Sequence, residues 1–107
     1  MTTFSQLSEL LEQQRRRDKR YLEFLRVPAM SAGVYVLGAG DTDPQKPHQE
    51  DEMYYVVSGR ARMQAGSEDQ AVQAGSVIFV PAQVKHRFYD ITEELVVVVF
   101  FAPAETE

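Results

Sequence analysis

The 107-residue chain is long enough for one hydrophobic core and too short for two, so a single domain is expected. Its net charge of −5 and pI near 5.0 argue against a nucleic-acid partner, because such proteins gather lysine and arginine against phosphates. It has no cysteine and no apolar run near the roughly 20 residues that span a bilayer, which excludes disulfides, thiol catalysis and a membrane-spanning segment.

The N-terminal region is predicted to form a short amphipathic helix. Residues 1–6 lack the basic and apolar segments of a secretory signal, so a cytoplasmic location is expected. Apolar side chains recur at helical spacing over about residues 4–16, and Thr3 with Gln6 has the form of a capping box. Residues 15–20 are basic, interrupted by Asp18, and are interpreted as a solvated helix end, with phosphate or membrane contact as the alternative. We assign residues 1–18 to a helical element that covers one end of the core.

The remainder of the chain is rich in short β-branched and aromatic segments. Strands are predicted over residues 21–27, 33–37, 53–57, 61–63, 77–80, 84–89 and 95–101. Turn-forming residues lie between them, at 38–47, 58–59, 66–69 and 75–76. Many short strands separated by such turns predict an all-β barrel or sandwich over residues 19–103, followed by a frayed acidic tail over 104–107.

The last predicted strand, residues 95–101, is continuously apolar. A strand of this kind is either covered on both faces within its own protomer or presents one face to a partner. The sequence leaves both alternatives open.

The only two histidines belong to a constellation with metal-binding chemistry. His48, Glu52 and His86 together make a two-histidine, one-carboxylate set, which metals of intermediate softness accept. His48 and Glu52 would lie roughly 13 Å apart on a straight strand, too far to share an ion, so a bend is predicted at residues 49–51. The alternative for His86 is a hydrogen-bonded polar residue in a barrel wall.

Glu50 lies two residues from both His48 and Glu52, so its side chain can share their side of the chain. Three roles stay open for it: a fourth ligand, an acceptor that orients a histidine, or a solvated turn residue.

The spacing of these residues resembles the two sequence motifs of the cupin superfamily. The first motif has the form G-x5-H-x-H-x3-E-x6-G, and the corresponding positions here are Gly40, Lys46, His48, Glu52 and Gly59. The second has the form G-x5-P-x-G-x2-H-x3-N, and the corresponding positions are Gly75, Pro81, Gln83, His86 and Asp90. The chain is identified on this basis as a small single-domain, cupin 2-like protein.

The resemblance implies a jelly-roll β-barrel that holds one divalent metal ion through His48, Glu52 and His86. Lys46 stands where the family has its first histidine, and an ammonium group has no lone pair for a metal. The site therefore lacks one ligand unless Glu50 or water replaces it. The resemblance also implies a homodimer that pairs through strand edges, to which residues 95–101 would add apolar surface.

The pocket residues are predicted from strand parity and charge. Aromatic candidates to line the barrel are Tyr35, Tyr54, Phe79, Phe88 and Phe100. Tyr54 and Phe88 share parity with Glu52 and His86, so they are expected to face the substrate pocket. Lys46 either projects into solvent or stands at the pocket mouth and attracts an anionic substrate.

The predicted function is a metal-binding protein that binds or acts on a small molecule. Iron would support oxygenase chemistry, whereas zinc, manganese or nickel would act as a Lewis acid in isomerisation, hydrolysis or decarboxylation. The alternatives are a non-catalytic barrel that binds or senses a small ligand, and a metal-free barrel in which Lys46 marks a decayed site.

Overall fold

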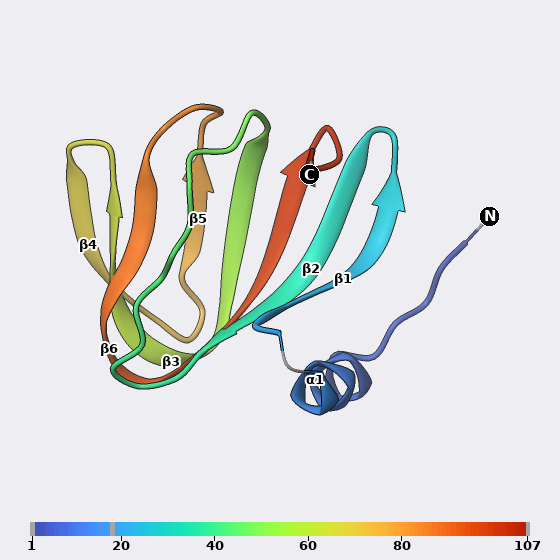
Figure 1. Ribbon diagram of the computed structural model, residues 1–107, viewed down its shortest axis with the longest axis horizontal. Coiled ribbons are helices and arrows are strands. Elements are labelled where there is room, and N and C mark those ends of the chain that lie inside the picture. The colour runs from blue at the N-terminus through green and yellow to red at the C-terminus, as the bar shows by residue number, and fades with distance from the viewer. Residues whose placement is uncertain (1, 18, 107) are drawn as a thin grey trace.

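A single curved antiparallel β-sheet dominates the computed structural model, which describes residues 2–17 and 19–106 (Figure 1). The elements are α1 (Leu7–Arg16), β1 (Tyr21–Val27), β2 (Met30–Leu37), β3 (Asp51–Ala65), β4 (Glu68–Gln73), β5 (Val77–Val80) and β6 (His86–Ala102). The order along the six-stranded sheet is β1-β2-β6-β3-β4, and β5 pairs with β3. The expectation of an all-β fold with a short N-terminal helix is confirmed.

Two long strands, β3 and β6, carry the curvature of the sheet. The sequence predicts each as two short strands, and this is wrong, because β3 continues through the predicted turn at 58–59 and β6 through residues 90–94. The register between them shifts repeatedly between Val56 and Arg62, and such bulges bend a strand while leaving it hydrogen-bonded. The sheet therefore curls over onto itself, with β4 and β1 at its opposite edges (Figure 1).

Gly59 lies at this bend and makes it possible. Its φ of +98° belongs to the region that glycine alone adopts readily. A Cβ at this position would also lie 2.2 Å from the carbonyl oxygen of Glu94 on β6. The close approach of the two bent strands thus requires the absence of a side chain.

Strand β4 is missing from the sequence prediction. It pairs with β3 from Arg60 opposite Gln73 to Ala65 opposite Glu68, yet only Val72 of its residues is buried. A polar edge strand shows no alternation of apolar and polar residues, so its composition resembles a loop. The predicted turn at 66–69 is correspondingly shorter and ends at Ser67.

Helix α1 packs on the outer face of the sheet. Its three leucines, Leu7, Leu10 and Leu11, contact a cluster that includes Val34 on β2 and Val96 on β6. The helix therefore covers a face of the sheet, and the predicted position over one end of the core is wrong. It begins later than predicted, without a side-chain cap, so the predicted capping box does not form. None of the described helices has the length and apolar character needed to cross a bilayer.

The apolar run at the end of β6 is covered mainly by its own protomer. Leu95, Val97 and Val99 point into the main core, and Val96 lies in the cluster beneath α1. Phe100 alone within the run is exposed, at 37 %. Burial within the protomer is thus the interpretation that describes most of this strand.

The predicted frayed tail is instead held against the sheet. The backbone N–H of Glu105 donates to Ser31 Oγ at 2.9 Å. The N–H and hydroxyl of Thr106 both donate to Glu50 Oε2, at 3.1 and 2.9 Å. The tail is ordered because the buried oxygens of Ser31 and Glu50 need hydrogen-bond donors, which residues 105 and 106 supply. Asp18, the predicted end of the helical element, and Glu107, the last residue of the predicted tail, lie outside the described residues together with Met1.

Replacement of Gly59 by alanine is expected to destabilise the protein more than replacement of Gly75. Both glycines have positive φ, but a Cβ at Gly75 would meet nothing within 4 Å. Gly75→Ala should therefore lower the free energy of unfolding by about 1 kcal/mol from backbone strain alone, and Gly59→Ala by clearly more. Urea unfolding of both variants gives the comparison, and equal losses would contradict the role assigned to the bend.

Candidate metal centre

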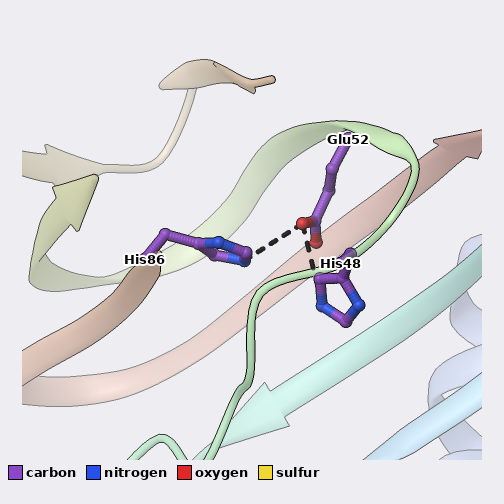
Figure 2. A group of neighbouring side chains, drawn as sticks. All are labelled: His48, Glu52 and His86. Atoms are coloured by element: carbon purple, nitrogen blue, oxygen red, sulfur yellow. Dashed lines mark ion pairs between the residues drawn. The ribbon is translucent and has the colours of Figure 1, made fainter. Parts of the chain in front are cut away.

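Three side chains with metal-ligating atoms meet inside the curved sheet (Figure 2). His48 lies in the loop before β3, Glu52 near the start of β3, and His86 is the first residue of β6. One ligand atom from each lies within 4.8 Å of the others. His86 Nε2 is 3.0 Å and His48 Nε2 is 3.9 Å from Glu52 Oε1. The structure therefore brings together the three ligands that the sequence predicts.

A bend in the backbone allows His48 and Glu52 to approach each other. The chain bends at Gln49 and Glu50, and β3 begins at Asp51, in agreement with the predicted bend. The carbonyl of His48 accepts a 2.7 Å hydrogen bond from the N–H of Gln83. Gln83 has a φ of 70°, the left-handed conformation for which the family motif places glycine. This contact joins the two motif loops directly.

Glu52 is a buried carboxylate with few partners. Its side chain is 1 % exposed, and apart from the His86 ring nitrogen facing Oε1, neither oxygen has a hydrogen-bonding partner in the described chain. An ionised carboxylate in such a place costs several kcal/mol, on the order of 3 or more, unless a positive charge is near. The electrostatics of the centre therefore favour a cation.

His86 is oriented by its backbone neighbour. Its Nδ1 faces the carbonyl of Val84 at 2.9 Å, which places the ring proton on Nδ1 and the lone pair on Nε2 in the neutral imidazole. Burial lowers the pKa of His86, but the contacts with Glu52 and the Val84 carbonyl outweigh burial and raise the pKa overall.

His48 is oriented by the C-terminal segment. Its Nδ1 lies 3.2 Å from Glu105 Oε2, so its Nε2 faces Glu52. Burial, together with the nearby charges of Glu52 and Glu50, raises the pKa of Glu105 to about 7. Imidazole ligands in metal sites are commonly oriented in this way by an acceptor on their second nitrogen. The sequence does not predict the position of Glu105, because no residue pattern in the tail indicates that it returns to the sheet.

Glu50 occupies a different place from the other candidates. It is 3 % exposed, so the interpretation as a solvated turn residue is wrong. Its Oε2 accepts the two hydrogen bonds from Thr106, and its side chain does not belong to the group of ligand atoms around Glu52. The Glu50 side chain is therefore buried because it binds the C-terminal tail.

A cavity of about 200 Å³ adjoins the centre. Its lining is largely aromatic and apolar, and four of its side chains are polar or acidic, namely Gln45, His48, Glu52 and Glu105. The other lining residues are Tyr21, Tyr35, Pro44, Tyr54, Val99 and Phe101. The volume lies below the roughly 300–1,000 Å³ of typical drug-sized pockets, so the ligand that fits is small.

Of the aromatic residues predicted to face the pocket, some lie inside the curved sheet and others on its outer face. Tyr54 lines the cavity, while Phe88 packs behind it with ring centroids 5.0 Å apart. Phe79 and Phe100 are 57 % and 37 % exposed, so their predicted place in the barrel is wrong. Both lie opposite Met53, whose parity differs from that of Tyr54. Lys46 is exposed and is not among the residues that line the cavity, so its role in substrate binding stays a prediction.

The loop before β3 is organised by a buried carboxylate that the sequence analysis did not single out. Asp43 accepts hydrogen bonds from the Tyr35 hydroxyl at 2.7 Å, the Phe88 N–H at 2.9 Å and the Gln45 side-chain amide at 2.8 Å. These bonds fix the loop to β2 and β6. Aspartates are common in exposed loops, so the sequence around Asp43 does not indicate that this side chain is buried.

Tyr21 brings an unpaired hydroxyl to the cavity wall. Its ring lies against Gly33, where a Cβ would be 2.2 Å from the ring carbon Cζ. The hydroxyl is buried and has no hydrogen-bonding partner among the described residues. A polar group in this state is a candidate donor for a bound ligand.

Two tyrosine-to-phenylalanine variants should differ in stability: one should lower the free energy of unfolding and the other should not. Tyr35→Phe removes the hydrogen bond to buried Asp43 and is expected to lower the free energy of unfolding by about 1–2 kcal/mol. Tyr21→Phe removes a hydroxyl without a partner, so the protein should be at least as stable as the wild type. Thermal unfolding of the ligand-free proteins tests both, and a loss in Tyr21→Phe as large as that in Tyr35→Phe would contradict the assignment.

Comparison with known proteins agrees with this fold. A family model described as a cupin domain matches residues 33–102. An uncharacterised protein of Streptomyces coelicolor is 51 % identical over 100 residues, covering 94 % of this chain and 95 % of that protein.

Two solved structures share the fold at low sequence identity. A protein from Thermus thermophilus has a TM-score of 0.74 at 22 % identity and covers 94 % of this chain and 97 % of its own. An RmlC-like cupin from Shewanella frigidimarina has a TM-score of 0.72 at 20 % identity, covering 78 % and 75 %. At these identities the likeness concerns the fold alone.

Proposed function

Because the chain belongs to the cupin family, we propose that it holds one divalent metal ion through His48, Glu52 and His86 and binds a small molecule in the adjoining cavity. The observation that carries the proposal is the environment of Glu52. Its buried carboxylate faces two imidazole Nε2 atoms and has no other partner among the described residues. A divalent cation would neutralise the carboxylate and accept the imidazole lone pairs.

The donor atoms fit a metal of intermediate softness. Two imidazole nitrogens and one carboxylate oxygen suit Fe, Mn, Ni or Zn, whereas calcium takes oxygen ligands alone. Each imidazole has an acceptor on its Nδ1, which leaves Nε2 free to bind. The fit is therefore supported by both the ligands and the groups that orient them.

A metal ion bound here would supply Lewis acidity or, in the case of iron, redox chemistry. The residues of the chain would supply a largely aromatic and apolar cavity and the Tyr21 hydroxyl as a donor. The ionisable side chains that line the cavity, apart from tyrosines, are the carboxylates Glu52 and Glu105 and the imidazole of His48, whereas Lys46 is exposed and lies outside the lining. The cavity thus favours a small neutral molecule over the anionic substrate that Lys46 would attract. A non-catalytic ligand-binding barrel is the competing function, and turnover of a bound ligand would exclude it.

Metal content should depend on His86. Tag-free protein purified after growth with transition metals is expected to carry close to one equivalent of metal, and His86→Ala should lose at least about 99 % of the affinity, since a buried ligand is removed. Elemental analysis measures the content. Gln70→Ala, an exposed position on β4, serves as the control. Equal metal content in wild type and His86→Ala would refute the centre.

We also propose that a second copy of the chain covers the outer face of β5, β3 and β6. Two rows of apolar side chains cross these strands: Phe79, Met53 and Phe100 in one row, and Val77, Tyr55 and Val98 in the next. Most of them are more than one-third exposed, and none is charged. Apolar patches of this extent commonly mark protein interfaces. Of the run 95–101 the patch includes only Val98 and Phe100, because the other residues of that run are buried.

A charge within this patch should weaken the dimer. Phe79→Glu is expected to raise the dimer dissociation constant by about 30-fold, the equivalent of roughly 2 kcal/mol for a central aromatic side chain. Light scattering across a dilution series provides the measurement. Phe4→Glu alters an exposed phenylalanine on the N-terminal segment and should leave the dimer unchanged. A wild type that is monomeric at all concentrations would contradict the proposal.

A further inference from the structure

The side chain of Gln45 ends beside the three ligand atoms. Its Oε1 lies 3.3 Å from His48 Nε2 and 3.2 Å from His86 Nε2. The same two nitrogens face Glu52 Oε1 at 3.9 and 3.0 Å. We infer that Gln45 Oε1 is the fourth ligand of the metal ion, supplying the donor that Lys46 cannot supply. The inference rests on the proposed metal site and goes beyond its three residues.

The distances agree with four donors around one ion. Ligands about 2.0–2.1 Å from an ion in a tetrahedral arrangement lie roughly 3.3 Å from one another. The four distances between the imidazole nitrogens and the two oxygens run from 3.0 to 3.9 Å. These four of the six donor-to-donor distances are therefore compatible with a tetrahedral shell.

The facing atoms are all acceptors, which is unfavourable without a cation. In neutral His86 the Nδ1 proton points to the Val84 carbonyl, so Nε2 presents a lone pair to Gln45 Oε1 and Glu52 Oε1. A proton on Nε2 lies along one direction and would satisfy one of the two oxygens. A metal ion accepts lone pairs from all four atoms at once.

The orientation of the Gln45 amide is fixed by its neighbours. Its Nε2 donates to buried Asp43 Oδ2 at 2.8 Å, which turns Oε1 toward the imidazoles. The Tyr54 hydroxyl donates to Oε1 at 2.8 Å and uses one of its two lone pairs. The other lone pair is available to a metal ion. Asp43 is thereby a positioning residue for this ligand.

The local sequence explains why the ligand comes from position 45. Lys46 occupies the position of the first motif histidine, and its side chain is exposed. Gln45 is half-buried and lines the cavity. The backbone N–H and the side-chain amide of Gln45 both donate to Asp43, and these bonds hold Gln45, rather than Lys46, over the centre. A neutral amide oxygen in place of an imidazole leaves the charge of the site unchanged and makes its donor set harder.

Substitutions at Gln45 test the inference through metal affinity. Gln45→Leu replaces the amide by an apolar side chain that is one bond shorter and has no donor atom, and it should raise the dissociation constants for Zn²⁺ and Mn²⁺ at least about tenfold. Gln45→His restores a donor that can still bond to Asp43 and should bind at least as tightly as the wild type. Gln49→Ala, an exposed glutamine in the adjacent bend, is the matched control. Competition with a chromogenic chelator gives the constants.

The absorption spectrum of the Co²⁺-loaded proteins separates ligation from positioning. If the side chain at 45 binds the metal, the cobalt bands change in Gln45→Leu and again in Gln45→His, and they stay unchanged in Gln49→Ala. Wild-type affinity and spectrum in Gln45→Leu would overturn the inference and leave the three-residue site standing. Failure of the wild type to bind any of these metals would overturn the proposed function and the inference together. Thermal unfolding of each variant identifies any loss of folded protein.

Discussion

The bend in the β3–β6 ladder is the constraint on which the centre depends. Glu52 pairs with Phe101 near one end of this ladder, and His86 pairs with Ala65 at the other. Thirteen residues of β3 separate the two positions (65 − 52), about 43 Å along a straight strand. The curled sheet brings Glu52 Oε1 and His86 Nε2 to 3.0 Å. The same curvature encloses the core, so the stability of the fold and the assembly of the centre have one cause.

The loop before β3 and the C-terminal tail supply the remaining residues of the centre. The loop before β3 brings His48 to the centre, and hydrogen bonds to Asp43 hold that loop against Tyr35 and Phe88. The tail brings Glu105 to the other side of His48. Buried acidic groups thus perform two tasks here. Those with donors fix the chain, and Glu52, which has almost none, is the group that the proposed cation would neutralise.

The sequence predicted the parts of the centre that depend on spacing. His48, Glu52 and His86 follow from motif intervals and from the chemistry of imidazole and carboxylate, and the approach of His48 to Glu52 required only that the chain bend near Gln49. The cupin fold followed from the same intervals and is confirmed by the family match. Edge strand β4 was missed, because a strand with one buried side chain has no apolar periodicity.

The residues that surround the centre could not be predicted in this way. Asp43, Gln45 and Glu105 reach it through loop and tail conformations, and no periodic pattern connects such segments to a sheet face. Phe79 and Phe100 were assigned to the interior by aromatic character, whereas register places both opposite outward-facing Met53. The motif spacing therefore does not predict the polar contacts between distant segments, and these contacts are seen only in the structure.

The return of the tail also bears on how the protein is handled. Glu105 is at once a wall of the cavity and the partner of His48, and its backbone is bonded to Ser31. A histidine tag placed directly after residue 107 would be separated from Glu105 by only two residues and would bring its own histidines to the edge of the cavity. The segment that precedes α1 leads away from the sheet (Figure 1), so a tag on that side lies far from these contacts. Purification from the N-terminal side therefore keeps the surroundings of His48 as the fold builds them.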